Sequence, residues 1–409
     1  MSDVLIIGAG AAGLTAAGVA SMAGKSVTVL ERNDRPARKV MITGKGRCNV
    51  TNNCSDIDTL ISNVPVNGRF LYSAFSRFMP ADTMELFEDM GVRLKTERGG
   101  RVFPVSDKAS DIVDALVQFA TDDGAQIVNA RAKELIVENG CVKGAVTYDG
   151  ESFFADKVII ATGGKSYPGT GSTGDGYELA RSVGHTVTPL KPSLISLECH
   201  EGFCTDLQGL TLKNVSLKVV DTKLKKDIYN DFGEMIFTHF GVSGPMILSA
   251  SSHMRQMEKG RYELIVDMKP RLDYEQLDAR ILRDFSENNN KNFINSLGGL
   301  LPRKMIPVAV RLSGIRPTEK VNQITKEQRR ALARVLKGLT LHVTDFSPIE
   351  QAVITSGGVK VSEINPKTME SKIIKNLYFA GEVIDVDAYT GGFNLQIAFS
   401  TGHLAGENV

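Results

Sequence analysis

The first thirty-one residues combine a short apolar run, a cluster of glycines and a longer apolar segment. Val4 to Ile7 has the pattern of a buried parallel strand, and Gly8 to Gly13 that of a tight turn. Leu14 to Met22 is small and apolar, as expected for a helix packed closely on a sheet, and Ser26 to Glu31 predicts a second strand. This order of elements predicts a βαβ unit.

Amphipathic helices and short strands follow. Helices are expected at Pro80–Met90 and Ser110–Asp122, and Lys157–Ala161 predicts another buried strand. Turn residues at Asn139-Gly140 and Asp149-Gly150 favour a meander between these elements. Its expected strands are Gln126–Asn129, Glu134–Glu138, Cys141–Tyr148 and Ser152–Ala155.

The pattern changes near Pro189 and Pro192. Short alternating segments predict a small antiparallel sheet or barrel within 191–270, and residues 271–337 become helical and polar. A buried strand at Leu377–Gly381 and an apolar helix at Gln396–Leu404 then restore the first pattern. We therefore expect an α/β protein in which residues 1–190 and 346–409 form a two-part Rossmann-type domain. The inserted domain, 191–345, is expected to hold a β-barrel-like part and a small helical subdomain.

Composition narrows the functional classes. The chain has 48 Lys and Arg residues and 47 Asp and Glu residues, a formal charge of +1. This balance argues against a broad surface for nucleic acid or an anionic membrane, although local basic patches stay open. Five scattered cysteines and a start without a signal-peptide pattern favour a reducing, cytoplasmic location. We expect a small-molecule substrate and no nucleic-acid or membrane partner, with the oligomeric state undetermined.

The glycine cluster fits the G-x-G-x-x-G pattern of dinucleotide sites. Gly8 allows the tight turn, Gly10 lets the backbone approach a pyrophosphate, and Gly13 lets the helix pack close to the sheet. The helix start at Ala11 and Ala12 offers free N–H groups to phosphate. A glycine-rich turn in an unrelated α/β protein is the alternative, but Glu31 ends the second strand, where an acid can accept hydrogen bonds from ribose. An acid here disfavours the 2′-phosphate of NADP.

Two later segments favour FAD over NAD. KVIIATGG at 157–164 is a strand that ends in a glycine-rich turn containing Thr162 and Gly163. Further on, a strand ends at Gly381-Glu382, and Gly391-Gly392 precedes a second helix. In two-part FAD domains, the N–H groups of such a helix, here near Asn394–Gln396, can stabilise the negative charge of reduced flavin.

Six motifs together resemble a known family. They are GAGAAGL at 8–14, RKVMITGKGRCNVTN at 38–52, ATGGKSYPGTGSTGDGYELA at 161–180, FTHFGVSGPMIL at 237–248, ITSGGVKVSEINPKTMESK at 354–372 and LYFAGEVIDVDAYTGGFNLQIAFSTGHLAG at 377–406. The resemblance is to the bacterial flavoproteins that include aminoacetone oxidases and flavin reductases of bile-acid dehydroxylation (BaiN-like). It implies FAD, a Rossmann-type domain, a β-barrel-like insertion and a small helical subdomain.

The resemblance also suggests cofactor residues outside the glycine motif. Lys39 or Arg47 would offset pyrophosphate charge, and the backbone of Ala132 would meet adenine. The complete set of expected cofactor-binding residues is Gly8, Gly10, Ala11, Ala12, Gly13, Glu31, Arg32, Lys39, Gly44, Arg47, Cys48, Asn49, Ala132, Thr162, Gly163, Gly381, Glu382, Gly392, Phe393, Asn394, Leu395 and Gln396.

Several other patterns have less specific interpretations. Gly169–Gly174 is a second formal G-x-G-x-x-G, but no acid follows it at the right spacing, so a loop is favoured over an NAD(P)H site. Cys199 and Cys204 have the C-x₄-C spacing of some disulfide reductases, yet they fall in the insertion and are interpreted as ordinary thiols. His239 and Tyr389 are either proton donors or structural residues. The six histidines show no metal-binding spacing.

Three functions remain open from the sequence. The first is a flavin oxidoreductase that moves a hydride between FAD and a small organic substrate, as in NAD(P)H-linked reduction of a C=C bond of a dehydro-bile acid. An oxygen-dependent amine oxidase of the aminoacetone type is its oxidative version. The second is a tRNA-modifying flavoprotein, and the third a non-enzyme that binds FAD. The catalytic residues cannot be assigned from the sequence.

Overall fold

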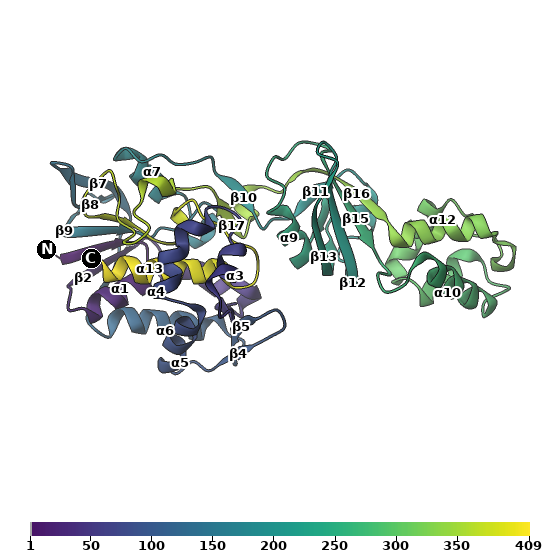
Figure 1. Ribbon diagram of the computed structural model, residues 1–409, viewed down its shortest axis with the longest axis horizontal. Coiled ribbons are helices and arrows are strands. Elements are labelled where there is room, and N and C mark those ends of the chain that lie inside the picture. The colour runs from purple at the N-terminus through teal and green to yellow at the C-terminus, as the bar shows by residue number, and fades with distance from the viewer. Residues whose placement is uncertain (1) are drawn as a thin grey trace. The chain divides into compact units, whose positions relative to one another are not determined.

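The computed structural model describes residues 2–409, which divide into two compact units (Figure 1). The first unit contains the residues up to Ser193 together with Pro348–Val409, and the second is Leu194–Ser347. The chain thus leaves the first unit once and returns to it.

A seven-stranded sheet forms the centre of the first unit. Its strands follow the order β6-β2-β1-β9-β8-β7, and β18 pairs with β9. The strands β6, β2, β1, β9 and β18 pair in parallel, whereas β7 and β8 continue the sheet as an antiparallel meander. Their bounds are β1 Ser2–Ile7, β2 Val27–Glu31, β6 Gln126–Asn129, β7 Ala132–Glu138, β8 Cys141–Thr147, β9 Ser152–Ile160 and β18 Leu377–Phe379.

Strand β9 corrects one expectation. The sequence predicted two strands, Ser152–Ala155 and Lys157–Ala161, but the structure has a single strand across both. Its first residues pair with β8 and alternate in burial, whereas its last residues, Val158 to Ile160, are fully buried between β1 and β18. The first half of β9 therefore belongs to a meander buried on one face, and its second half to a parallel sheet buried on both faces. The hydrophobic pattern changes between the two halves, and in the sequence this change looks like the boundary between two strands.

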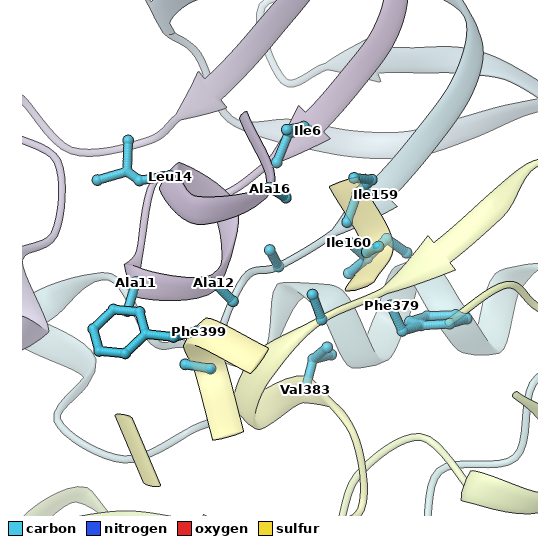
Figure 2. Packing of buried hydrophobic residues seen from close by; sticks show 14 of the residues in the cluster. Ile6, Ala11, Ala12, Leu14, Ala16, Ile159, Ile160, Phe379, Val383 and Phe399 are labelled. Atoms are coloured by element: carbon cyan, nitrogen blue, oxygen red, sulfur yellow. The ribbon is translucent and has the colours of Figure 1, made fainter. Parts of the chain in front are cut away.

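Helices α1 (Ala11–Met22) and α13 (Phe393–Glu407) pack together beside this sheet. A side chain at Gly402 would place its Cβ 2.4 Å from the carbonyl oxygen of Ala12, so the two backbones approach closely there. Figure 2 shows the apolar side chains around this contact, with Ala12 on α1 near Val383 and Phe399. The glycine and alanine residues of both helices make this packing possible.

The remaining elements of the first unit surround this core. The helices are α2 Arg38–Ile42, α3 Ile57–Ser62, α4 Tyr72–Arg77, α5 Pro80–Asp89, α6 Ala109–Thr121 and α7 Asp175–Ser182. The strands are β3 Thr51–Asn52, β4 Leu94–Thr96, β5 Arg101–Pro104, β10 Lys191–Ser193 and β17 Ile354–Ser356. Strands β3, β5 and β4 form a small antiparallel sheet, and β10 pairs with β17 where the chain leaves and re-enters the unit.

The second unit begins with a closed antiparallel barrel in the order β11-β14-β13-β12-β15-β16. Alternating buried positions along β12 and β15 fill its interior, as the alternating sequence pattern predicted. The barrel strands are β11 Leu197–Cys199, β12 Thr211–Asp221, β13 Lys226–Phe237, β14 Gly241–Ser243, β15 Tyr262–Asp267 and β16 Leu339–Phe346, and the helices within this part are α8 Phe203–Asp206 and α9 Pro245–Ser251.

A helical part, 271–337, lies between β15 and β16 of the barrel. It contains α10 (Tyr274–Ser286), α11 (Ile306–Ser313) and α12 (Lys326–Lys337). Helix α12 packs against both α10 and α11, and Figure 1 shows α10 and α12 side by side. Capping boxes start α10 and α12, so two N–H groups at each helix start, those of the N-cap and N3 residues, are bonded to side chains of the same turn.

Candidate functional site

The turn after β1 has the geometry that the glycine motif predicts. Gly8 has a φ of 107°, and a Cβ there would lie 2.7 Å from the carbonyl oxygen of Ala161. A Cβ on Gly13 would lie 1.9 Å from the carbonyl oxygen of Gly8, so no larger residue fits without a backbone shift. Gly10 differs from both because its φ is −84° and no heavy atom lies within 4 Å of where its Cβ would be. Its glycine is thus unexplained by the protein's own packing.

The open space beside Gly10 adjoins the N-terminus of α1. No side chain caps this helix, and its first turn holds no acidic residue. The N–H groups of Ala11, Ala12 and Gly13 have no partner within a helix of this kind, and the helix dipole makes this end positive. Free donors beside an open glycine fit a pyrophosphate group.

The end of β2 presents a carboxylate to the same region. Glu31 is 7% exposed; its Oε2 accepts a hydrogen bond from the N–H of Ala9 at 2.9 Å, and its Oε1 accepts two from Asn33 at 2.7 and 2.8 Å. These three bonds fix the carboxylate and leave it further acceptor capacity. The N–H of Ala130 donates to the backbone oxygen of Glu31 at 2.9 Å, which brings Ala132 near this strand end.

The second glycine motif packs on this strand end. Asn33 donates to the carbonyl oxygen of Thr170 at 3.1 Å, and Arg32 donates to Thr173 at 2.5 Å and to Asp175 at 3.2 Å. Arg131 holds the same carboxylate through two bonds of 2.7 and 2.9 Å. Burial alone would raise the pKa of Asp175, but the bonds from Arg131 and Thr173 and the charge of Arg32 outweigh it and lower the pKa. Residues 169–174 thus form a loop beside the first motif.

Lys39 and Glu382 form a part-buried ion pair in the first unit. Lys39 Nζ donates to Glu382 Oε2 at 2.7 Å and to Ser166 Oγ at 2.8 Å. Glu382 Oε1 also accepts the N–H of Thr355 at 2.8 Å. The sequence placed Lys39 opposite pyrophosphate charge, whereas in the structure a carboxylate of the protein balances this ammonium group.

In the segment from Gly44 to Asn49, protein carboxylates likewise balance the charge of the basic residue Arg47. Arg47 forms ion pairs with Glu97 and Asp107, and its guanidinium lies 4.2 Å from the ring centroid of Phe103. The hydrogen bonds that Arg47 donates to Glu97 and Asp107 raise the pKa of its guanidinium group. Arg47, like Lys39, therefore has protein carboxylates as its partners.

Cys48 and Asn49 follow in the same segment. Cys48 is fully buried, and burial raises the pKa of its thiol to about 12, so the reactive thiolate is suppressed. Asn49 Oδ1 and Thr162 Oγ1 are buried polar atoms without a hydrogen-bond partner in the protein. Such atoms indicate positions where a bound group can supply the missing partner.

The second helix terminus, at α13, is also built by glycine. Gly392 has a φ of 101°, and a Cβ there would lie 2.3 Å from the backbone of Thr51 on β3. No side chain caps α13, and its first turn holds no acidic residue. The N–H groups of Phe393, Asn394 and Leu395 are the free ones in this first turn.

Gln396 departs from its expected role. Its N–H donates to the carbonyl oxygen of Gly392 at 3.1 Å, and its fully buried side chain bonds to Thr51, Thr83 and Ser400 and to the backbone of Phe78. These bonds use its donors inside the protein. Gln396 therefore holds α13 in place and has no N–H left for a cofactor.

The first and last motifs of the chain meet at Ala12. A Cβ on Gly381 would lie 2.9 Å from the Cβ of Ala12, and Gly402 of α13 faces the backbone of the same residue. The start of α13 lies nine residues before Gly402, about 14 Å along the helix axis. Two helix N-termini are thus arranged along one contact, and each favours negative charge. FAD carries such charge at two places, its pyrophosphate and its reduced flavin ring, so these residues fit FAD.

The remaining candidates from the sequence, among them His239, Tyr389 and Cys199, have other contacts. His239 is exposed and stacks edge-on with Phe240, whereas the N–H of Tyr389 donates to Asn63 within the first unit. Contact with Cys204 and burial raise the pKa of Cys199. Within residues 2–409, no group of three or more His, Cys, Asp or Glu side chains has the arrangement of a metal site. None of the helices there is long and apolar enough to cross a membrane.

Sequence reasoning missed the polar residues that fix this site. Asp175, Arg131, Ser166 and Thr355 lie in separate segments and have no spacing that connects them. Only the fold brings them to Arg32, Lys39 and Glu382. The sequence hinted at two of them only by position, because Arg131 directly precedes Ala132 and Asp175 directly follows the second glycine motif.

These features define a dinucleotide-binding protein of the Rossmann class with a barrel-containing insertion. The model of the HI0933-like protein Rossmann domain matches residues 2–408. The chain is 33% identical over 417 residues to the 3-dehydro-bile acid delta(4,6)-reductase of Clostridium scindens, covering 99% of this chain and 98% of the relative. It is 30% identical to the ribosomal RNA dihydrouridine synthase of Escherichia coli, covering 98% and 96%.

The fold also matches solved structures. The 3-ketosteroid delta1-dehydrogenase of Sterolibacterium denitrificans aligns with a TM-score of 0.55 at 14% identity, covering 99% of this chain and 98% of the other. The chain belongs to the HI0933-like family. It is an FAD-dependent oxidoreductase.

Proposed function

We propose that this protein reduces a C=C bond conjugated to a carbonyl group. The observation that carries the proposal is the near full-length similarity to two kinds of named enzyme. A 3-dehydro-bile acid with delta(4,6) unsaturation is a conjugated ketone, and dihydrouridine arises when the C5=C6 bond of uracil, conjugated to its C4 carbonyl, is reduced. Both names therefore describe addition of hydrogen to the same kind of bond.

The overall reaction balances with a nicotinamide as reductant. NAD(P)H and one proton add two hydrogens across the C=C bond and leave NAD(P)⁺. When bound, FAD supplies the two-electron hydride chemistry that connects the oxidation of NAD(P)H to the reduction of the C=C bond. The chain's own residues bind and orient it: the N–H groups of Ala11 and Ala12 would hold the pyrophosphate and Glu31 a ribose. The free N–H groups at the start of α13 would stabilise negative charge on the reduced ring.

A stopped-flow redox experiment tests this function. The FAD-loaded protein is reduced anaerobically with NADH or NADPH and then mixed with a 3-dehydro-4,6-diene bile acid or with a uridine-containing RNA. We expect rapid return of the oxidised-flavin spectrum with one of these acceptors and a product heavier by two hydrogens. No acceleration by any conjugated C=C acceptor would refute the proposal. Rapid reoxidation only by O₂ with an amine as reductant would instead identify the amine oxidase of the sequence analysis.

A further inference from the structure

The helical part of the second unit, 271–337, carries a strong positive charge that the whole-chain balance conceals. It has fourteen Lys and Arg residues and seven Asp and Glu residues, a formal charge of +7. Since the whole chain is +1, the remaining residues carry −6. Charge is therefore segregated along the chain, and a partner with opposite charge would meet this part.

The pairing of these charges separates structural from free ones. Arg280, Arg329 and Lys337 are only partly exposed, and each has an acidic partner. The eleven other basic residues are exposed, and among them only Arg311 has an ion pair, to Asp206. These exposed residues are Arg271, Arg283, Lys291, Arg303, Lys304, Arg311, Arg316, Lys320, Lys326, Arg330 and Arg334. Acidic partners thus neutralise the three inner cations, whereas ten of the eleven exposed ones have no ion pair.

Helix α12 arranges three of the cations without an ion pair in one line, and the charges of two of them, Lys326 and Arg330, contribute to lowering the pKa of the neighbouring Glu327. Lys326, Arg330 and Arg334 are spaced four residues apart, so they share one face and succeed each other by about 6 Å along the axis. Like charges at this spacing repel each other and destabilise a helix. This helix keeps two such pairs, which is unfavourable for folding and favourable for binding a chain of anions.

An apolar pocket adjoins the basic residues. It has a volume of about 370 Å³ and lies at the end of α11. Val310, Ile315 and Pro317 are among its lining residues, together with the side chains of Arg311 and Arg316. A planar base can stack on a guanidinium group or on an apolar wall, and this pocket offers both.

We propose that the helical part 271–337 is an RNA-binding surface, with the α12 line on the phosphate backbone and an unpaired base in the α11 pocket. The inference rests on the proposed function and selects its substrate class, because RNA presents uracil to a C=C reductase. It departs from the sequence expectation of no nucleic-acid partner, which averaged the charge over the chain. A membrane fits less well, since Leu332, Ala333 and Leu336 of α12 are buried and Ala331 and Val335 are half-buried.

Salt-dependent binding tests the phosphate contacts. Fluorescence anisotropy with a labelled RNA hairpin and the FAD-loaded full chain gives the affinity between about 50 and 200 mM salt. In the triple variant K326Q/R330Q/R334Q we expect at least tenfold weaker binding. The slope of log K against log salt should be smaller by about 2, since each single-strand phosphate contact contributes about 0.7.

A matched variant controls for net charge. K25Q/K367Q/K375Q removes three exposed lysines of the first unit that have no ion pair, and we expect its RNA affinity to equal that of the wild type. Equal weakening in both triple variants would overturn the proposal, as would binding to phosphatidylserine vesicles without binding to RNA. Arg316→Lys keeps the charge and loses the planar group, so it should weaken binding without changing the salt slope.

The two proposals fail separately. If the wild type does not bind RNA while its reduced flavin is still reoxidised by a conjugated ketone, the RNA surface is refuted and the C=C reductase remains. If RNA binds through α12 but no conjugated acceptor reoxidises the flavin, the reductase is refuted. Reduction of the flavin by NAD(P)H in K326Q/R330Q/R334Q at the wild-type rate shows that the variant is folded.

Discussion

Lys39 and Glu382 are joined by a 2.7 Å ion pair although 343 residues separate them in the chain. The pair connects α2 to the segment after β18, and Ser166 and Thr355 bond to the same carboxylate. Four segments of the first unit, including the one that returns after the insertion, therefore meet at one carboxylate. This cluster of polar contacts holds the two parts of the domain together in addition to their apolar core.

Removal of the Glu382 carboxylate should destabilise the first unit. Glu382→Ala removes the charged acceptor of Lys39, which keeps only Ser166, and leaves the N–H of Thr355 without its acceptor, at a cost of about 1–3 kcal/mol in the free energy of unfolding. Urea denaturation of the flavin-free protein measures this loss. The control Glu178→Ala removes an exposed pair with Arg181 and should cost less than about 1 kcal/mol. Equal losses of stability in the two variants would contradict a stabilising role of the Glu382 cluster.

A methyl group at Gly402 should reverse the usual effect of alanine in a helix. Glycine to alanine normally stabilises a helix interior by about 0.5–1 kcal/mol. Here the new Cβ would lie 2.4 Å from the backbone oxygen of Ala12, so we expect α1 and α13 to separate at a cost of about 1–3 kcal/mol. Thermal unfolding checks the sign, with Gly298→Ala as the control because its Cβ meets no neighbour. A stabilised Gly402→Ala protein would show that the helices pack less closely.

Substitution of Gly10 should separate folding from cofactor binding. The Cβ of Gly10→Val would have no heavy atom of the protein within 4 Å, so we expect the thermal stability without FAD to stay close to that of the wild type. The valine would occupy the space proposed for pyrophosphate and weaken FAD binding by at least about tenfold, or 1.4 kcal/mol. Flavin fluorescence titration measures the dissociation constant. Gly169→Val, an equally open glycine of the second motif, should keep wild-type affinity; a loss there instead would place the pyrophosphate at the second motif.

Acidification should destabilise the first unit partly through His185. Burial lowers the pKa of His185 from 6.5 and outweighs the opposite effect of Glu363. Below about pH 6.5, His185 binds a proton more readily in the unfolded chain than in the folded protein, so the free energy of unfolding falls as the pH falls. Urea titrations at about pH 7.5 and 5.5 should show a smaller fall in His185→Gln than in the wild type. The same fall in both proteins would assign the effect to His403, another histidine of the first unit whose pKa is lowered by burial.

The sequence by itself determined the parts of the fold that depend on local patterns. The turn at Gly8–Gly13 and the helix that follows it are set by backbone sterics and periodicity within about twenty residues, and the structure has them. The glycine pair before α13 is local in the same sense, since Gly392 has a φ that other residues rarely adopt. The alternating segments of the insertion likewise predicted a small antiparallel sheet or barrel, and the structure has a closed barrel.

The tertiary structure decided what each polar group binds. Gln396 bonds inside the protein and Lys39 pairs with Glu382, because burial makes an unpaired polar group costly and the nearest partner comes from a distant segment. No local spacing encodes such a partner. The same holds for charge: a total of +1 is a sum over the chain, whereas the free cations of 271–337 are defined by which neighbours the fold gives each side chain.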